Sequence, residues 1–412
     1  MSQSYNSVTR RALISGSGAA AFSAALGMPI PFARFLPKGM TPIALAQEGG
    51  AIPGKSGLTI LGDRPLNAET PPHFLDDAIT SATHMFVRNN GLTPTISAED
   101  VANWRLKIDG EVETPLELSI SDLRAQFESV TLQLQIECGG NGRRFMTPAA
   151  RGNQWSFGAV SCAQWTGVRL ADVLNRAGLK PTAVYTGHEG ADPHLSGDPE
   201  KMPISRGVPI AKAMEPHTII AYAMNGADIP LLNGHPLRVI APGWPGSCSQ
   251  KWLTRIWVRD REHDGEKMGG QSYRVPKYPV APGTEVPDAD MKIIESMPVR
   301  SIITSPMTGA RVNANNIFEA RGHAWAGDNQ VAQMDVSMDF GASWSRAELT
   351  APANRYAWQH WRADISLPQA GYFEIWARAR DENGDMQPPV QPGWNPRGYL
   401  NNLQHRIAVF AL

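Results

Sequence analysis

The chain is poor in cysteine and in charge, and each shortage excludes a class of protein. Its 412 residues include three cysteines, Cys138, Cys162 and Cys248, which allow at most one disulfide and exclude a disulfide framework. Charged residues make up 19% of the chain and the formal net charge is −1. We therefore expect no general affinity for nucleic acid or for anionic membranes.

Several common catalytic and metal-binding motifs are also missing. There is no C-x-x-C-H for attaching a c-type haem, no H-E-x-x-H, and no paired C-x-x-C spacing for zinc. No G-x-S-x-G or G-x-G-x-x-G lies between a recognisable strand and a helix. Haem held by this chain, the common zinc sites, serine nucleophiles and bound dinucleotides are therefore not expected.

The first 46 residues have the pattern of an export signal. Thr9–Ile14 contains a twin-arginine signature, a mildly apolar stretch rich in Ala and Gly follows, and Ala44–Ala46 provides an A-x-A cleavage site. A disordered basic terminus or a membrane anchor is the alternative interpretation. Glycines and prolines interrupt the apolar stretch, which disfavours a membrane-spanning helix, and we expect none in the mature protein. The pattern predicts export of a folded protein, with its cofactor already bound, to the periplasm.

The remainder predicts an α+β protein of two domains. Residues 47–285 mix short strands with one clear helix that ends at Gly178. The apolar face of this helix consists of Val168, Leu170, Val173, Leu174 and Ala177. A proline-rich linker, VPKYPVAPGTEVP, covers residues 275–287.

Beyond the linker, short alternating strands predict an immunoglobulin-like β-sandwich over residues 290–412. One apolar alternation consists of Met334, Val336, Met338 and Phe340, and a second of Phe373, Ile375, Ala377 and Ala379. Gly341 is expected to turn the chain after the first of these strands.

The stretch QIECGGNGRRFM, residues 135–146, places a cysteine at the end of a strand. Apolar and polar residues alternate from Val130 to Glu137, so we expect a half-buried strand with Cys138 on its apolar side. Gly139 and Gly140 remove side chains where another group must approach the backbone. The arginines that follow favour a thiolate and bind anions.

A buried core cysteine is the structural alternative for Cys138. A nucleophilic cysteine needs a base, and no histidine lies within forty residues of Cys138 on either side. A soft metal ligand therefore fits this position better.

Further segments occur in a characteristic order along the chain. They are FVRNN (86–90), CGGNGRR (138–144), WTGVRLADVL (165–174), AYAMNG (221–226), NGHPLRVIAPGWPG (233–246), KWL (251–253), QSYRVP (271–276) and WNPRGYLNN (394–402). In these segments the chain resembles the sulfite oxidase family of molybdenum enzymes, and within it exported bacterial sulfite dehydrogenases. The resemblance covers nearly all of the mature chain. It implies a mixed α/β domain that binds a molybdenum–molybdopterin cofactor, followed by an immunoglobulin-like dimerisation domain, and hence a homodimer.

The resemblance also implies roles for individual residues. Cys138 matches the family's thiolate ligand of molybdenum, and Tyr273 matches its active-site tyrosine. The arginines that match those around the anionic substrate are Arg88, Arg143 and Arg397. The residues at cofactor-binding positions are Phe86, Val87, Asn89, Asn90, Asp192, Asn233, Arg238, Ser249, Gln250 and Lys251. The family commonly has histidine where Asn90 and Asn233 stand, and asparagine cannot become cationic.

The implied activity is oxidation of sulfite to sulfate at the molybdenum centre. Because no haem motif is present, a separate periplasmic c-type cytochrome is the expected electron acceptor. Within the family, the alternative is a sulfane dehydrogenase component of a thiosulfate-oxidising system, acting on sulfur bound to a carrier protein. A reductase of oxidised methionine would generally be shorter and lack the second domain. A non-catalytic adhesion or binding protein would hold no molybdenum and would have no use for Cys138.

Overall fold

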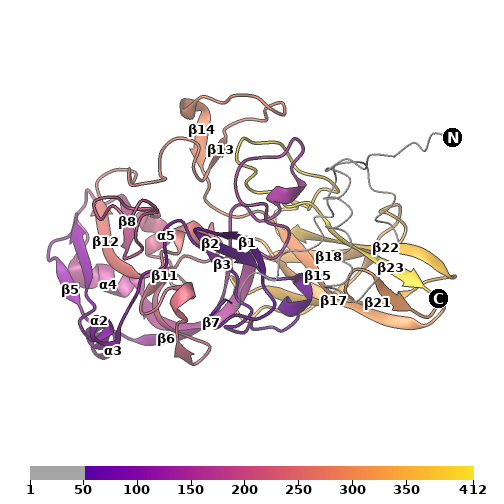
Figure 1. Ribbon diagram of the computed structural model, residues 1–412, viewed down its shortest axis with the longest axis horizontal. Coiled ribbons are helices and arrows are strands. Elements are labelled where there is room, and N and C mark those ends of the chain that lie inside the picture. Colours follow the sequence, from indigo (N-terminus) through magenta and orange to yellow (C-terminus); the bar gives the residue numbers. More distant parts are fainter. Residues whose placement is uncertain (1–51) are drawn as a thin grey trace, which may run out of the picture. The chain divides into compact units, whose positions relative to one another are not determined.

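A computed structural model describes residues 52–412, and strands make up most of its regular structure (Figure 1). The export signal predicted for residues 1–46 lies outside the described residues. Within residues 52–412, no helix combines the length and the apolar character that a membrane crossing requires.

Three sheets and four short helices form the part of the described chain that precedes the linker. One sheet has the order β1 (Thr59–Asp63), β2 (Leu66–Glu69) and β3 (Val87–Arg88). The second has the order β10 (Ala227–Asp228), β9 (Ile219–Met224), β7 (Val160–Arg169) and β6 (Ser129–Glu137), with β11 (Arg238–Ile240) paired to β9. The third has the order β5 (Leu116–Leu118), β4 (Leu106–Gly110), β12 (Leu253–Arg259) and β8 (Tyr185–Gly190). The α-helices are α2 (Ala98–Ala102), α3 (Ile120–Gln126), α4 (Leu170–Ala177) and α5 (Ile210–Ala213).

Short 3₁₀ turns complete this part of the chain and its linker. They are η2 (Pro72–Leu75), η3 (Arg143–Phe145), η4 (Leu231–Asn233), η5 (Gly246–Cys248) and η6 (Asp288–Asp290). Strand β12 pairs with β4 in parallel and with β8 antiparallel. The predicted mixed α/β character is confirmed.

The helix predicted from apolar periodicity is α4. It begins at Leu170 and ends at Ala177, and Gly178 follows with a φ of 73°, a conformation that glycine adopts without strain. The buried side chains of α4 join the same core as Val168. Val168 itself belongs to β7, so the predicted helical face extended two residues too far.

Two antiparallel-rich sheets form the predicted β-sandwich in the C-terminal part. One has the order β15 (Arg300–Ser305), β17 (Ile317–Trp325), β21 (Gln359–Ser366) and β20 (Glu348–Leu349). The other has the order β16 (Ala310–Val312), β23 (His405–Ala411), β22 (Gly371–Asp381), β18 (Val331–Ser337) and β19 (Ser345–Arg346). Side chains from both sheets share one apolar core, as the alternating pattern predicts.

One predicted strand of the sandwich is too long. Met334 and Val336 are buried in β18, but the strand ends at Ser337. Phe340 lies in the following turn with a φ of 59° and is 56% exposed. The prediction that Met338 and Phe340 continue the strand was wrong, because the Ser337 hydroxyl accepts from the Gly341 amide at 2.9 Å and stabilises a turn there instead.

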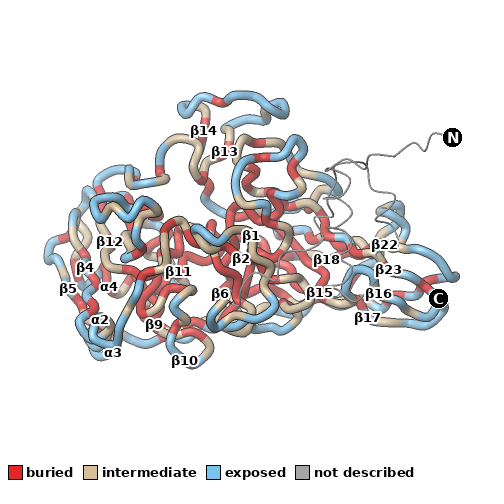
Figure 2. Tube along the Cα trace, in the orientation of Figure 1, coloured by how far each residue is buried: buried red, intermediate tan, exposed pale blue. Residues whose placement is uncertain are grey.

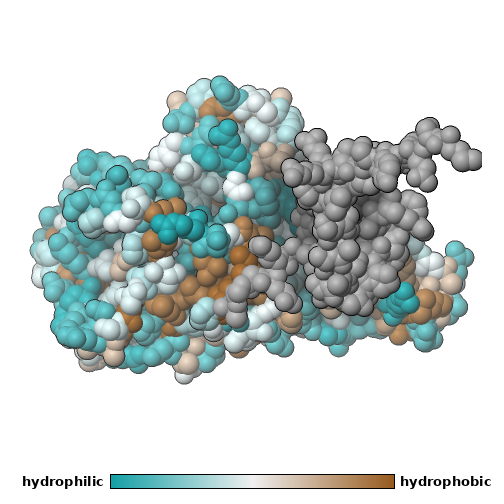
Figure 3. Space-filling view, in the orientation of Figure 1, coloured by the Kyte–Doolittle hydropathy of each residue, from teal (hydrophilic) through white to brown (hydrophobic). Residues whose placement is uncertain are grey.

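The proline-rich segment forms the loop between the two strands of one small antiparallel sheet. Strand β13 (Arg274–Pro276) pairs with β14 (Met291–Ile293), and the loop between them is mostly exposed (Figure 2). In the view of Figure 3, hydrophilic side chains predominate on this loop. The first strand after the predicted linker therefore pairs back onto the preceding segment, not onto the sandwich.

Strand β6 shows how the sandwich closes over the rest of the chain. Its alternation was predicted, yet its C-terminal end is buried on both sides. Glu137, 1% exposed, accepts from the Trp325 indole at 2.7 Å and pairs with Arg300, 2% exposed, at 2.5 Å. Pattern alone predicts a solvated Glu137, because the residues that cover it come from much later in the chain.

The buried Glu137–Arg300 pair leads to a prediction about the free energy of unfolding. Arg300→Met is expected to lower the free energy of unfolding by about 3–5 kcal/mol, because it leaves the Glu137 carboxylate buried without its cation. Arg321→Met is the matched control, since the Arg321–Asp76 pair is partly exposed and its loss should cost about 1 kcal/mol or less. Urea unfolding of the two variants measures the difference. Equal losses would contradict the role given to the Glu137–Arg300 pair.

Candidate active site

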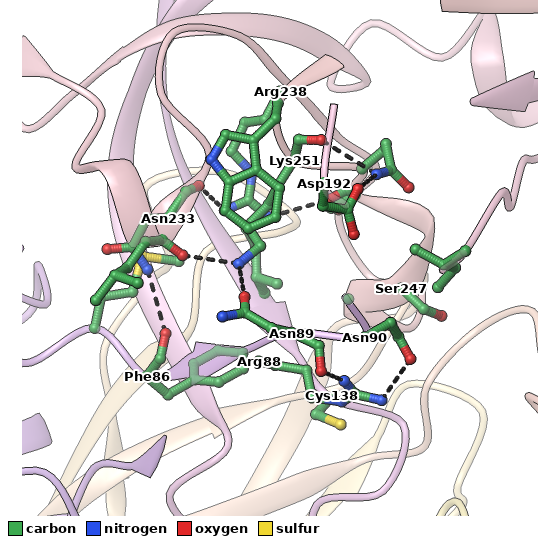
Figure 4. A pocket seen from close by; sticks show the side chains of 18 of the residues that line it. Phe86, Arg88, Asn89, Asn90, Cys138, Asp192, Asn233, Arg238, Ser247 and Lys251 are labelled. Carbon is green, nitrogen blue, oxygen red and sulfur yellow. Dashed lines mark hydrogen bonds between the residues drawn. The ribbon is translucent and has the colours of Figure 1, made fainter. Parts of the chain in front are cut away.

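Residues from the ends of several strands and the turns between them line one cleft (Figure 4). Arg88 ends β3, Cys138 follows β6, Arg238 begins β11 and Lys251 precedes β12. The cleft encloses about 660 Å³ of empty space, including open solvent at its mouth. Its lining is thus assembled from segments far apart in the sequence.

Cys138 is a free thiol, 5% exposed, and it lines the cleft. Its backbone is fixed, because its amide donates to the Ala159 carbonyl at 2.9 Å and its carbonyl accepts from the Asn141 amide at 2.8 Å. Cys162 and Cys248 are also free and buried, but they do not line the cleft. Burial raises the pKa of the Cys162 thiol to about 12. Cys138 is thus the cysteine placed to bind something in the cleft.

Gly140 makes room for a residue of the same loop. A Cβ atom at this position would lie 2.3 Å from a terminal nitrogen of Arg143, whereas one at Gly139 would make only ordinary contacts. The prediction that another group approaches the glycine backbone is therefore confirmed at Gly140, where that group is the Arg143 guanidinium. It does not hold at Gly139.

One side of the cleft holds a cluster of cations, of which Arg238 is buried and Lys251 is half-buried. Arg238 donates to the carbonyls of Asn233 at 2.6 Å and Ser249 at 3.0 Å. Lys251 donates to the Asn89 side chain and to the Leu232 carbonyl. Burial lowers the pKa of Arg238 to about 9, and burial followed by the charge of Arg238 lowers that of Lys251 well below its ordinary value. These cations have carbonyl partners but too little negative charge nearby.

Asp192 is the one carboxylate that lines this cleft within the described residues. Burial raises its pKa to about 6, although Lys251 acts in the opposite direction. Two polar atoms, the Nε of Arg238 and the hydroxyl of Ser247, are buried and have no hydrogen-bond partner among the described residues. An anionic group with several polar edges would satisfy both the charge and these atoms.

The other side of the cleft opens into a pocket lined by five cations and, within the described residues, no carboxylate. The cations are Arg88, Arg143, Arg151, Lys267 and Arg397. Burial lowers the pKa of Arg88, but the neighbouring Tyr273, Cys138 and Tyr399 together raise it above its ordinary value. Arg88 therefore stays charged beside the Cys138 sulfur.

Two of the three predicted substrate arginines are linked directly. The Nε of Arg143 donates to the Arg397 carbonyl at 2.6 Å, and its terminal nitrogen donates to the Asn153 carbonyl at 2.8 Å. The Nε of Arg397 is buried and has no partner among residues 52–412. The pocket thus combines fixed and unsatisfied guanidinium donors, which suits a small oxyanion.

Tyr273 lies where the two sides of the cleft meet. Its hydroxyl donates to the Asn90 side chain at 3.2 Å and accepts from the Arg88 guanidinium at 3.1 Å. Its backbone has a φ of 52°, which is uncommon for an aromatic residue and is typical of residues held in place for function. Asn90 therefore serves as an acceptor that a cationic histidine could not provide.

The structure brings together nearly all the residues predicted from the sequence. The predicted residues that line the cleft or its pocket are Phe86, Arg88, Asn89, Asn90, Cys138, Arg143, Asp192, Asn233, Arg238, Ser249, Gln250, Lys251, Tyr273 and Arg397. Val87 does not, because it is fully buried in β3 and paired with Ala68 of β2.

Sequence reasoning missed Arg151, Lys267 and Ser247. Arg151 and Lys267 line the anion pocket, and Ser247 lines the cleft. Arg151 lies in a loop and Lys267 in a turn, where charged residues are ordinarily solvated. Ser247 lies in PGSCS, two residues before the predicted Ser249, and this proximity is the one available signal.

Lys55 lies beside the cation cluster and makes the stability of the folded protein depend on pH. It donates to the Asn233 side chain at 2.5 Å, and burial followed by the charge of Arg238 lowers its pKa to about 7. An unfolded lysine titrates near pH 10.4, so between about pH 7 and 10 the unfolded chain binds more protons and folded stability rises with pH.

We expect the melting temperature of cofactor-free protein to gain less between pH 7 and 9 in Lys55→Met than in the unaltered chain. Thermal denaturation at each pH measures the slope. If the melting temperature rises equally with pH in the variant and in the unaltered chain, the lowered pKa assigned to Lys55 is wrong.

A free thiol, a set of under-neutralised cations and an adjoining anion pocket together suit an anionic group that can also bind a sulfur ligand. The family model "Oxidoreductase molybdopterin binding domain" matches residues 91–267, and "Mo-co oxidoreductase dimerisation domain" matches residues 291–411. Sulfite oxidase of Gallus gallus is 31% identical over 375 residues, covering 89% of this chain and 80% of the relative. The chain belongs to the sulfite oxidase family of molybdenum enzymes.

Two further similarities cover most of the chain. Mitochondrial sulfite oxidase of Drosophila melanogaster is 35% identical over 368 residues, covering 84% of this chain and 62% of the relative. The chain thus spans less than two thirds of that relative's length. The crystal structure of the sulfane dehydrogenase SoxCD from Paracoccus pantotrophus matches with a TM-score of 0.69 and 25% identity, covering 92% of this chain and 96% of that one.

The described residues fit the family's molybdenum–molybdopterin cofactor. The unpartnered Arg238 Nε and Ser247 hydroxyl provide donors for an anionic group and for heterocycle edges. Cys138 provides a soft sulfur ligand on the same cleft. The free thiol and the excess of buried positive charge are both accounted for by such a group.

Proposed function

We propose that this protein is an exported sulfite dehydrogenase that oxidises sulfite to sulfate and passes electrons to a separate c-type cytochrome. The observation that carries the proposal is the anion pocket beside Cys138, with five cations and no carboxylate among its described lining residues. Sulfite carries one to two negative charges near neutral pH, so guanidinium donors suit it better than an apolar wall. The sulfite oxidases among the relatives support the same substrate.

In this proposal the cofactor occupies the cation cluster. Cys138 would bind the metal, while Arg238 and Lys251 would neutralise the anionic part and Ser247 would donate a hydrogen bond. When bound, the molybdenum–molybdopterin group supplies two-electron redox chemistry and oxygen transfer.

The protein's own residues bind and orient the substrate. Arg88, Arg143 and Arg397 would hold sulfite by charge-assisted hydrogen bonds and stabilise the charge that develops during reaction. Tyr273, bonded to Arg88 and Asn90, would fix the direction of the Arg88 guanidinium.

The assembly and location of the protein are part of the proposal. We infer a homodimer formed through residues 290–412, and the dimerisation-domain match supports it. The twin-arginine pattern before Gln47 supports export to the periplasm. Because the chain has no C-x-x-C-H motif, the proposed electron acceptor is a separate c-type cytochrome.

Steady-state assays test the activity. Purified protein loaded with molybdenum is expected to oxidise free sulfite with ferricyanide or a c-type cytochrome as acceptor, and to form one sulfate per two electrons. Molybdenum-loaded protein that is inactive with free sulfite would overturn the proposal.

A second candidate function is supported by the SoxCD similarity over 92% of this chain. As a sulfane dehydrogenase, the protein would act on sulfur bound to a carrier protein. The same assay separates the two, because a sulfane dehydrogenase requires the sulfur-loaded carrier whereas a sulfite dehydrogenase does not.

Arg397 provides a test of the anion pocket. Arg397→Gln removes a charge that no acid among residues 52–412 neutralises, and a hydrogen bond to a charged group contributes about 1.5–3 kcal/mol. We therefore expect the KM for sulfite to rise by about 10- to 100-fold at unchanged molybdenum content. The matched control is Arg311→Gln, an exposed arginine in β16, which should keep the original KM. An unchanged KM in Arg397→Gln would remove Arg397 from substrate binding.

A further inference from the structure

Four side chains form a continuous stack beside the anion pocket. The Arg206 guanidinium lies over the Tyr273 ring, 4.7 Å from its centroid. The Tyr273 and Tyr399 rings stack with centroids 5.5 Å apart and planes 19° apart. The Arg143 guanidinium lies 5.1 Å from the Tyr399 centroid. Two aromatic rings therefore connect two cations, and one end of the stack is a predicted substrate arginine.

Arg206 has no acidic partner within the described residues. It is fully buried, donates to the Lys267 carbonyl at 3.1 Å, and approaches the Cys248 sulfur at 3.8 Å. Its Nε has no hydrogen-bond partner among residues 52–412. The face of the Tyr273 ring is therefore a principal source of negative potential for this cation.

Hydrogen bonds fix the backbone of Tyr399 and of the residue after it. The side chain of Asn395 bonds both backbone groups of Tyr399, with each distance at 2.9 Å. The next amide, that of Leu400, donates to the Gly139 carbonyl at 3.0 Å. These bonds attach the Tyr399 segment directly to the loop that follows Cys138. The ring itself lines the anion pocket.

We propose that Tyr399 and Arg206 are positioning residues that hold Tyr273 and Arg143 in their working orientations. Tyr399 stacks on Tyr273 and supports the Arg143 guanidinium, and Arg206 packs on the Tyr273 ring. The stack thereby keeps the Tyr273 hydroxyl on Arg88 and Asn90 and keeps Arg143 aimed at the anion pocket. The kinetic part of this inference rests on the proposed sulfite oxidation, and the structural part does not.

Removing the ring of Tyr399 tests the proposal. In molybdenum-loaded Tyr399→Leu we expect kcat/KM for sulfite to fall at least tenfold, through both a higher KM from Arg143 and a lower kcat from Tyr273. Tyr399→Phe keeps the stack and should lose far less. Tyr278→Leu makes the same exchange at an exposed site and should leave both constants unchanged.

A double-mutant comparison distinguishes positioning from general damage. In a Tyr273→Phe background, adding Tyr399→Leu should lower kcat by less than threefold, because the hydroxyl that the stack positions is already gone. An equal loss of kcat in both backgrounds would contradict the proposal.

Fluorine NMR of protein labelled with 3-fluorotyrosine tests the same inference without sulfite. The fluorine lies on one side of the ring, so a Tyr273 ring that does not flip on the NMR timescale gives two resonances, one for each orientation. Both are assigned by their loss in Tyr273→Phe. We expect one averaged resonance in Tyr399→Leu and two in Tyr399→Phe. Two unchanged resonances together with unchanged kinetics in Tyr399→Leu would overturn the proposal.

Arg206→Met provides a second route if Tyr399→Leu fails to fold or to bind molybdenum. It removes the cation while nearly keeping the side-chain length, and it should also average the Tyr273 resonances. Retention of two resonances would overturn the role of Arg206. A protein inactive with sulfite in which Tyr399→Leu still averages the Tyr273 resonances would refute the proposed function and leave the positioning role standing.

Discussion

Replacement of Cys138 with serine is expected to lower sulfite oxidation at least about 100-fold, because serine offers a protonated, hard oxygen in place of a soft thiolate. The site itself should stay intact, since serine is nearly the same size and the Cys138 backbone is fixed by Ala159 and Asn141. Steady-state kinetics normalised to molybdenum content measure the effect.

Cys162→Ser is the matched control for this exchange. Cys162 is free and buried like Cys138, but it does not line the cleft. Its replacement should reduce stability and leave the turnover per molybdenum unchanged. A Cys138→Ser protein with full activity and normal molybdenum binding would remove the cysteine from its proposed role.

Arg238→Met is expected to have little effect on the cofactor-free protein and a large effect on the loaded protein. In cofactor-free protein the free energy of unfolding should change by about 1 kcal/mol or less, because relief of a buried charge offsets the lost bonds to two carbonyls. In loaded protein the lost cation should lower cofactor retention at least about tenfold, since an anion loses its charge-assisted partner.

Melting temperatures with and without cofactor measure this difference, because a bound cofactor stabilises by mass action. The gap between the two temperatures should shrink in Arg238→Met and persist in the exposed control Arg124→Met. An undiminished gap in Arg238→Met would show that Arg238 does not hold the cofactor.

The sequence predicted those parts of the fold that follow from local periodicity. Strand β6 and helix α4 follow from apolar spacing and from the stop at Gly178. Cys138 was placed correctly at the end of β6, because side-chain direction alternates along a strand. Phe340 was misassigned because a turn bonded to Ser337 ends β18 before the alternation does.

The parts that were missed depend on contacts between distant segments. Glu137 is buried because Arg300 and Trp325 of the sandwich cover it. Arg151 and Lys267 reach the anion pocket from a loop and a turn, so no periodic pattern distinguishes them from solvated charges.

The stack could not be predicted from sequence either. Arg206, Tyr273 and Tyr399 come from three separated segments, and each alone is typical of a core or surface residue. The resemblance to a family provided roles for single residues, whereas the packing that orients them is visible in three dimensions alone.

X-ray absorption at the molybdenum edge tests the central claim most directly, namely that the Cys138 sulfur binds molybdenum inside the cation-lined cleft. The account predicts about one molybdenum per chain in the purified protein, with one sulfur neighbour fewer in Cys138→Ser than in the unaltered chain and none lost in Cys162→Ser. A loaded protein whose molybdenum has the same number of sulfur neighbours in all three would contradict it.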